Sequence, residues 1–145
     1  MLSKKAKYAI KALTVLCKGM DQPSLGIAYI ASQENIPRKF LESILRELRI
    51  HGFRVSKRGK GGGYALLRMP ETISIGQVIR LMDGRVALTP CASRTDYKPC
   101  SDCVTPNACS LRPLMVRVCQ TTDRMLDKTT LRDLVNDEPL MQFAI

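Results

Sequence analysis

The chain has 145 residues, of which 45% are hydrophobic and 25% are charged, and its formal net charge is +10. This length is enough for one domain with a hydrophobic core, and no apolar run reaches the roughly eighteen residues that a membrane-spanning helix needs. Lys11 interrupts the apolar stretch that follows the charged start, which argues against a secretory signal peptide. We therefore expect a cytoplasmic protein.

The excess positive charge lies entirely in the first half of the chain. Residues 1–68 contain 14 Lys and Arg against 4 Asp and Glu, whereas residues 69–145 contain 9 of each kind. A basic segment of this type can bind nucleic acid, an anionic membrane surface or an acidic protein. The uneven distribution favours a polyanion-binding half joined to a neutral half with another role.

Residues 3–18 are predicted to form an amphipathic helix that ends at Gly19. Its apolar stripe and its lysine stripe lie on different faces, and no Trp or Phe marks a membrane-facing side. A helix packed on the core with a solvated lysine face is therefore favoured over a membrane-surface helix. Lys4, on the lysine face, is a candidate contact to DNA phosphates.

Two further helices are predicted next. Ser24 is the expected N-cap of a short helix over residues 25–32, and Pro37 is placed where proline is tolerated at a helix start. The second helix has one apolar face and one polar face. The apolar face consists of Leu41, Ile44, Leu45 and Leu48, and the polar face of Arg38, Lys39, Glu42, Ser43 and Arg46.

A glycine-rich hairpin is predicted after the second helix. Residues 53–57 and 64–68 are strand candidates, and the segment between them is basic and rich in glycine. Helix, turn, helix and hairpin follow one another as in a winged helix-turn-helix, whose second helix enters the major groove while the wing meets the backbone. We predict a mainly α protein with a small β-wing. The candidate DNA contacts are Lys4, Arg38, Lys39, Glu42, Ser43, Arg46, Arg58, Lys60, Gly61 and Gly62.

Two of these assignments have alternatives. Glu42 would be repelled by DNA unless it accepts a hydrogen bond from cytosine N4, and it could instead be a solvated partner of Arg46 one turn later. The glycine segment could be a flexible linker, but the basic residues beside it favour a wing. It does not match a nucleotide-binding phosphate loop, because no Gly-Lys is followed by Ser or Thr.

The second half contains a cysteine-rich loop between helices. We predict a helix over residues 75–82, capped by Ser74 and ended by Gly84, and a long helix over 111–126, capped by Ser110 with Pro113 in its first turn. A short element is expected over 130–135. The predicted division is a DNA-binding domain at 1–83, a sensor loop at 84–110, a dimerisation helix with the short element at 111–135, and a tail at 136–145.

Four of the six cysteines lie in this loop, at Cys91, Cys100, Cys103 and Cys109, in the spacing C-x8-C-x2-C-x5-C. In a cytosolic protein, such thiols favour metal binding over disulfides. Structural zinc usually uses paired C-x2-C elements and only one is present, whereas iron-sulfur clusters accept looser spacings. The spacing alone ranks an iron-sulfur cluster first, a thiol switch second and zinc third.

The other two cysteines lie on helical patterns, and packing is the expected role of Cys17 and Cys119. No histidine or other evident base accompanies the loop cysteines, so nucleophilic catalysis has no support and we expect no enzyme activity.

The chain resembles the IscR-type, or Rrf2, family of bacterial winged-helix regulators, which includes NsrR and CymR. The resemblance is carried by SKKAKYAIKAL, FLESILRELRIHG, KRGKGGGYAL, ISIGQVIRLMDG and TLRDLV. It implies a DNA-binding regulator, expected to repress, that binds a pseudo-palindromic operator as a homodimer and senses redox, iron-sulfur or nitric oxide status. It also implies roles in DNA recognition for Glu42 and Arg58.

The resemblance extends to the cysteine loop with one departure. The family loop typically has the spacing C-x5-C-x5-C, which Cys103 and Cys109 match at its end, while Cys91 fits its start only with an insertion. The two positions that supply a fourth ligand in different family branches hold Arg112 and Tyr8 here. We infer that Cys100 replaces them. Two alternatives remain, namely a cluster-free regulator switched by thiol oxidation or by a partner protein, and a zinc-stabilised adaptor.

Overall fold

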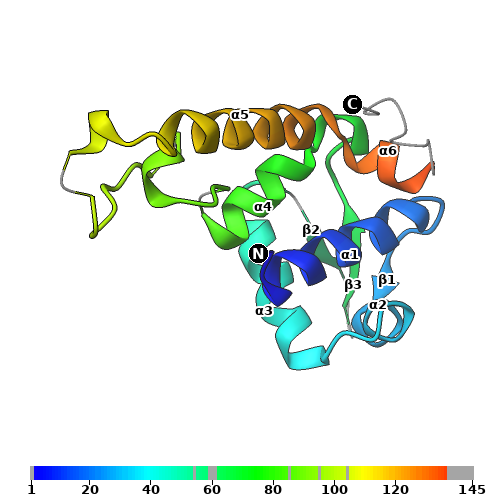
Figure 1. Ribbon diagram of the computed structural model, residues 1–145. Helices are drawn as coiled ribbons and strands as arrows, with labels where there is room; N and C mark the ends of the chain where they lie inside the picture. Colours follow the sequence, from blue (N-terminus) through cyan, green and yellow to red (C-terminus); the bar gives the residue numbers. More distant parts are fainter. Residues whose placement is uncertain are drawn as a thin grey trace.

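The computed structural model describes residues 2–53, 55–58, 62–84, 86–94, 96–103 and 105–136, with the backbone alone for residues 55–58. In these residues, short strands and short 3-10 turns separate the α-helices (Figure 1). The first half contains α1 (Lys4–Lys18), β1 (Leu25–Gly26), α2 (Ile27–Gln33), α3 (Arg38–Ile50), β2 (Val55–Arg58) and β3 (Gly63–Leu66). The second half contains η1 (Pro70–Thr72), α4 (Ile75–Asp83), η2 (Pro90–Ala92), η3 (Pro106–Ala108), α5 (Arg112–Lys128) and α6 (Leu131–Val135).

Helix α1 lies at the centre of the core. The hydroxyl of Ser3 accepts a hydrogen bond from the Ala6 amide and caps the helix, which ends before Gly19 as predicted. Its buried face packs against α2, α3, α4 and α6. Alanines at positions 6, 9 and 12 are fully buried, and their small side chains allow neighbouring helices to approach closely.

The predicted start of α2 was wrong. Leu25 and Gly26 do not begin the helix but pair as β1 with Tyr64 and Gly63 of β3, so Gly26 is the N-cap and the helix begins at Ile27. Pairing with β3 uses the backbone of Leu25 while burying its side chain, a long-range gain that outweighs a local cap at Ser24.

Helix α3 follows the predicted pattern. Pro37 is the N-cap, and the four apolar residues at 41, 44, 45 and 48 are buried. Gly52 takes a φ of +81° just after the helix, a conformation that favours glycine and turns the chain toward the hairpin.

The wing is an antiparallel hairpin within a three-stranded sheet of order β1-β3-β2. Val55 pairs with Leu66 and Arg58 with Gly63, so the predicted strands are displaced by one or two residues. Phe53 precedes β2 and is buried in the core. Arg68 lies beyond β3, where its guanidinium donates to the hydroxyl and carbonyl of Thr72.

Caps and a backbone hydrogen bond determine where α4 and α6 begin and how α5 meets α4. Ser74 caps α4 by accepting from the Gln77 amide, and Gly84 ends it with a φ of +78°. Thr130 and Asp133 form a reciprocal capping box at the start of α6. The Ile75 amide donates to the Thr129 carbonyl, which fixes the end of α5 beside the start of α4.

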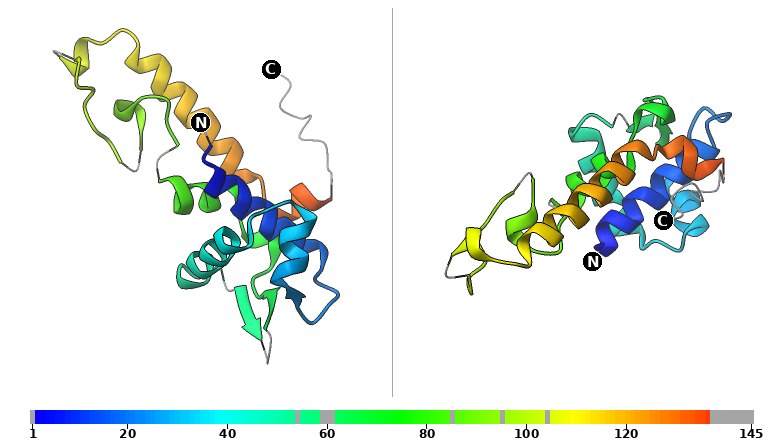
Figure 2. Two further views of the ribbon diagram at one scale, coloured as in Figure 1. Left: turned by 90° about the horizontal axis from the view of Figure 1, so that it is seen from below. Right: turned by 45° about the horizontal axis from the view of Figure 1, so that its top comes forward.

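The start of α5 differs from the prediction. Leu111 is the N-cap and makes no side-chain cap bond, so Ser110 does not cap this helix, and the first helical residue is Arg112. Pro113 lies in the first turn as expected. The start of α5 projects from the body together with the cysteine loop (Figure 2). Neighbouring elements therefore constrain the position of the first helical residue less than they constrain the end of the helix.

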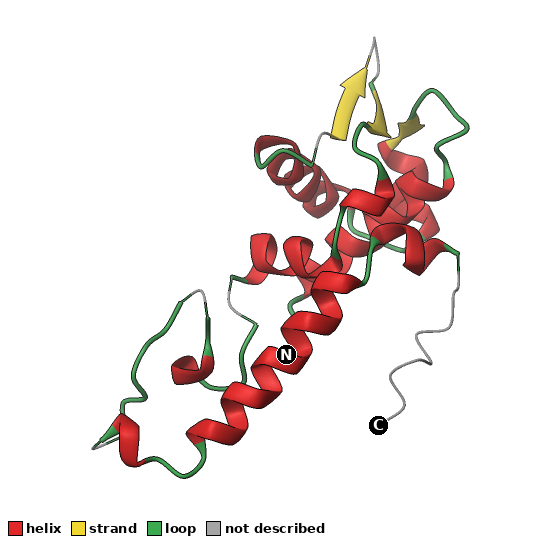
Figure 3. Ribbon diagram, turned by 90° about the horizontal axis from the view of Figure 1, so that it is seen from above, coloured by secondary structure: helices red, strands yellow, loops and turns green. Residues whose placement is uncertain are grey.

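The wing and the cysteine loop lie at opposite ends of the molecule (Figure 3). Helix α5 runs from the loop back to the body, where it packs on α4. Within the described ranges, no helix is both long and apolar enough to cross a membrane.

Candidate functional site

The polar face of α3 is exposed along its length. Arg38, Lys39, Glu42, Ser43 and Arg46 all have exposed side chains on the side opposite the buried leucines. Ser43 donates its hydroxyl proton to the Phe40 carbonyl at 2.8 Å, which leaves its oxygen able to accept. The structure therefore brings these five predicted residues together on one outer surface.

Glu42 has an ion-pair partner, although not the expected one. Its Oε1 lies 3.7 Å from the Nε of Arg38, one turn earlier, whereas we had considered Arg46, one turn later. Exposed pairs of this kind contribute little to stability, about 0.2–1 kcal/mol. Glu42 can exchange Arg38 for another partner at small cost.

Arg49 is a residue of this surface that the sequence analysis missed. It is exposed, and with Glu42, Leu45, Arg46 and Tyr64 it surrounds a hollow of about 250 Å³ between α3 and β3. Its position three residues after Arg46 was the signal that could have identified it. Tyr64 joins this surface because β3 folds back beside α3.

On α1, only some lysines remain without acidic partners. Lys5 pairs with Glu47 and Lys11 with Glu34, each at 2.7 Å, and both pairs attach α1 to neighbouring elements. Within the described part of the chain, Lys4 and Lys7 are exposed and have no ion pair. Lys4 is therefore available to a polyanion.

At the tip of the wing, the structure describes the backbone ladder and the turn residue Gly62. Arg58 pairs with Gly63 at the end of the ladder, and Gly62 has a φ of +55°, a turn conformation that favours glycine. The Arg58 side chain and the predicted contacts Lys60 and Gly61 lie outside the described residues.

The cysteine loop holds its four thiols as two interacting pairs, which are linked by the proximity of Cys100 and Cys103. Cys91 is buried in η2, and Cys100, Cys103 and Cys109 are half-buried. The thiols of Cys91 and Cys100 interact, as do those of Cys103 and Cys109, and the sulfurs of Cys100 and Cys103 are within 4.8 Å. All six cysteines are free thiols.

The loop makes these thiols chemically unequal. The Thr89 hydroxyl, 3.5 Å from the Cys91 sulfur, lowers the pKa of Cys91, with further help from Cys100 and from the charge of Arg112. The pKa of Cys100 is raised, mainly because its thiol proton is hydrogen-bonded toward Cys91. The pKa of Cys103 is raised by burial and by the neighbouring Cys109. Cys91 is thus the thiol most readily deprotonated in its pair.

Asp102 is a second residue that the sequence analysis missed. One of its carboxylate oxygens lies within 4.8 Å of the Cys100 and Cys103 sulfurs, so the C-x2-C segment presents an oxygen donor as well. Its place between two cysteines was the available signal. Thiolates are ligands typical of iron-sulfur clusters and zinc, and a carboxylate can complete such a set.

Arg112 faces this cluster from the first turn of α5. Its guanidinium carbon lies 5.9 Å from the centroid of the Tyr97 ring. Its Nε is buried and has no hydrogen-bond partner among the described residues. Two neighbouring thiol pairs, and a buried donor that lacks a partner among the described residues, fit an anionic, sulfur-ligated group such as an iron-sulfur cluster.

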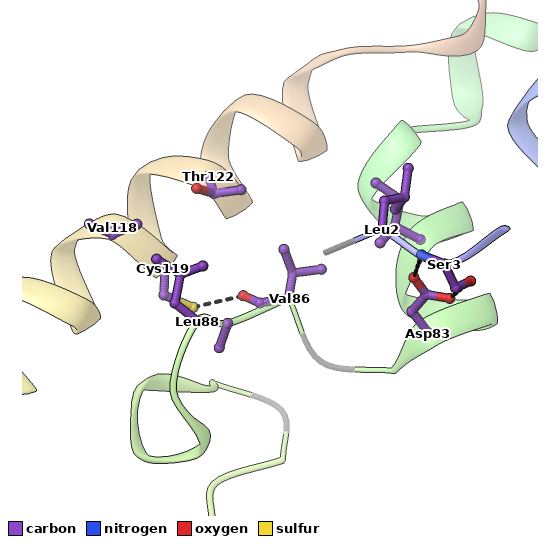
Figure 4. A pocket seen from close by; sticks show the side chains of 10 residues that line it. Leu2, Ser3, Asp83, Val86, Leu88, Val118, Cys119 and Thr122 are labelled. Carbon is purple, nitrogen blue, oxygen red and sulfur yellow. Dashed lines mark hydrogen bonds between the residues drawn. The ribbon is translucent and has the colours of Figure 1, made fainter. Parts of the chain in front are cut away.

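The remaining cysteines pack in the body. Burial raises the pKa of Cys17, which belongs to the core cluster. Burial also raises the pKa of Cys119, whose thiol donates to the Val86 carbonyl at 3.1 Å. Cys119 lines a pocket of about 480 Å³ together with Leu88, Val118 and the Ser3–Asp83 pair (Figure 4).

Contacts connect α5 with α4, and α4 with α1. Asp123 of α5 is buried and lies 3.6 Å from the Arg80 guanidinium of α4, which also pairs with Asp127. At the end of α4, Asp83 accepts hydrogen bonds from the amide and hydroxyl of Ser3. Helix α5, which follows the cysteine loop, is therefore joined to the start of α1 through polar contacts on α4.

An exposed basic recognition helix, a β-hairpin wing and a cysteine-rich loop before a projecting helix define a winged-helix transcriptional regulator. The sequence profile of the Rrf2 family, described as an iron-dependent transcriptional regulator, matches residues 2–137. The chain belongs to the Rrf2 family, whose members are regulators that bind DNA and not enzymes.

Individual relatives agree with this assignment. An rrf2-like HTH-type transcriptional regulator of Rhodobacter capsulatus is 41% identical over 138 residues, which is 93% of this chain and 92% of the relative. The HTH-type transcriptional regulator IscR of Yersinia pestis is 31% identical over 144 residues, covering 99% and 84%. The solved structure of CymR, the global cysteine regulator of B. subtilis, matches with a TM-score of 0.76 and 28% identity over 94% of this chain and 97% of that one.

The hydrogen bond from Thr89 yields a test of the Cys91 environment. Replacing Thr89 with Val removes the hydroxyl that stabilises the thiolate, so the pKa of Cys91 should rise. In reduced, metal-free protein, the pH at which Cys91 reaches half its maximal alkylation rate should move upward, as measured by mass spectrometry. Thr105→Val, at an exposed position of the same loop, is the control and should leave that pH unchanged. Equal midpoints in Thr89→Val and wild type would refute the assignment.

Proposed function

We propose that the protein is a cytoplasmic, homodimeric transcriptional repressor that binds a pseudo-palindromic operator with an affinity set by an iron-sulfur cluster in the cysteine loop. The observation that carries the proposal is the gathering of four free thiols, as two neighbouring pairs, in the loop before α5, at the end of the molecule opposite the wing. A regulator of this kind senses redox, iron-sulfur or nitric oxide status.

DNA binding is assigned to α3, α1 and the wing. The exposed stripe of α3 would read base edges, with Arg38, Lys39 and Arg46 as donors and Glu42 as an acceptor for cytosine N4. Lys4 would neutralise a phosphate beside the groove, and the wing glycines would let its backbone approach the duplex. Base reading would therefore fall to α3, and anchoring to the phosphates would fall to α1 and the wing.

The cluster would be held by Cys91, Cys100, Cys103 and Cys109. Bound iron would close the loop between residues 91 and 109 and neutralise the thiolates, whose mutual repulsion otherwise opposes convergence. The loop is continuous with α5, and α5 is linked to α4 by Arg80 and Asp123. Ordering of the loop on cluster binding would thereby be transmitted through α5 and α4 to the DNA-binding half.

A dimer is supported by apolar side chains on the outer face of α5. Leu111 and Leu114 are 51% and 55% exposed, and Leu88 of the adjoining loop is 73% exposed. A projecting helix with such a face is suited to an isologous contact with the same helix of a second copy. A dimer in turn matches the two-fold symmetry of a palindromic operator.

A rival within the same family is a cluster-free regulator switched by thiol oxidation. The two interacting pairs, Cys91 with Cys100 and Cys103 with Cys109, favour it because each could close a disulfide. A zinc-stabilised adaptor is a third possibility. Analysis of the bound metal separates the three.

Cluster binding has a direct test. Protein purified without oxygen should contain iron and acid-labile sulfide and absorb visible light, and Cys103→Ala should lose most of all three. Cys17→Ala, which changes a core thiol far from the loop, is the control and should keep its iron. Affinity for operator DNA should change on cluster loss in a gel-shift titration. A colourless, iron-free wild type, with DNA affinity unaltered by Cys103→Ala, would rule out the cluster. Bound zinc in place of iron would favour the zinc-stabilised adaptor.

The proposed DNA contacts predict that substitutions of Glu42 and Lys4 affect DNA affinity differently. Glu42→Ala should alter the preference among operator variants by up to about 1–3 kcal/mol at one base pair, because it removes direct readout. Lys4→Ala should weaken all sequences alike and reduce the slope of log affinity against log salt by about 1. Fluorescence anisotropy with operator variants measures both. Equal effects of the two substitutions across all variants would contradict readout by Glu42.

The dimer contact is tested by placing a charge on α5. Leu114→Asp should shift the sedimenting species from twice the chain mass toward a single chain, because a carboxylate cannot be buried in an apolar contact without a partner. Gln120→Asp, at another exposed position of the same helix, is the matched control. A wild type that sediments as a monomer at all concentrations would disprove the proposal.

A further inference from the structure

Arg112 has an unusual environment for a cation on a projecting helix. It is the first residue of α5, its side chain is half-buried, and its Nε is shielded from solvent without a hydrogen-bond partner in the described part of the chain. Burying a donor without an acceptor is unfavourable. A partner that accepts from this nitrogen would recover that cost.

The surroundings of Arg112 indicate where such a partner would lie. Tyr97 covers one side of the guanidinium, with 5.9 Å between the guanidinium carbon and the ring centroid. The charge of Arg112 acts on the thiol of Cys91. The nearby cation Lys98 already has a carboxylate partner, Asp96, at 3.4 Å. Arg112 thus has an aromatic ring on one side, follows Cys109 by three residues, and lies within electrostatic range of Cys91.

The acceptor would be anionic and based on sulfur. Four thiolates around one centre leave net negative charge on the sulfurs, and sulfur accepts N–H hydrogen bonds that tune the reduction potential of iron-sulfur centres. A guanidinium suits this role because it stays charged at all relevant pH values and presents N–H groups in a fixed plane.

We propose that Arg112 donates its Nε–H to a sulfur of the centre held by the loop cysteines, and so attaches that centre to the first turn of α5. This inference rests on the proposed iron-sulfur function and adds a positioning residue to it. Loss of the centre leaves the donor unpaired and releases the first turn, which carries Leu114 of the proposed dimer contact.

The test compares Arg112→Met and Arg112→Lys with wild type and with Arg117→Met, a control at an exposed position of the same helix. Each protein is purified without oxygen, analysed for iron and sulfide, and titrated to find the midpoint potential of its centre. Hydrogen exchange of the α5 amides is followed by mass spectrometry.

We expect Arg112→Met to have a more negative midpoint potential than wild type and Arg117→Met, because removing the cation disfavours the added electron. Amides in the first two turns of α5 should also exchange faster in Arg112→Met than in Arg117→Met. Arg112→Lys keeps the charge but lacks a donor at the Nε position, so its potential should lie between those of wild type and Arg112→Met.

Each of the other outcomes would contradict a specific part of the proposal. Equal potentials and equal exchange in Arg112→Met and Arg117→Met would overturn the role of Arg112 while leaving the cluster in place. If Arg112→Met fails to take up iron, Arg112→Lys decides, and a wild-type potential in that variant would overturn the hydrogen bond. Wild type without iron or sulfide would overturn both this inference and the proposed function.

Discussion

The close packing of α1 is the constraint on which the rest of the structure depends. Its face of small, fully buried residues, with Ala9 at the centre, lets α3, α4 and α6 approach one helix from different directions. This arrangement places the recognition helix on one side and α4, with α5 behind it, on another. A larger side chain at Ala9 would separate these helices, because a packed interior has little room to adjust.

The conformation of the cysteine loop is stabilised differently from that of the packed body. It has little apolar surface of its own to bury, so its irregular backbone depends on the thiols and on the helix that follows. Cys91 is held by Thr89 in η2, which packs beside α5, and Cys100 and Cys103 lie close to Asp102. A bound centre would supply the cohesion that a hydrophobic core supplies in the body.

Much of this could be predicted from local patterns. The buried and exposed faces of α3 were correct because a repeat of 3.6 residues determines both at once. The cap at Ser74 was correct because serine is a residue type that helix starts favour. The start of α2 was missed because Leu25 pairs with Tyr64, far away in sequence. Local propensity contains no information about such a pairing.

The sequence by itself determined the winged-helix order, the basic face of α3 and the presence of four cysteines in one loop, since each depends on residues near one another along the chain. Only the tertiary structure decided that Leu25 pairs with Tyr64, that Arg80 of α4 meets Asp123 of α5, and that the Nε of Arg112 is buried without a partner among the described residues. Spacing restricts which residues can meet, but orientation and burial depend on the packing of segments distant in the chain.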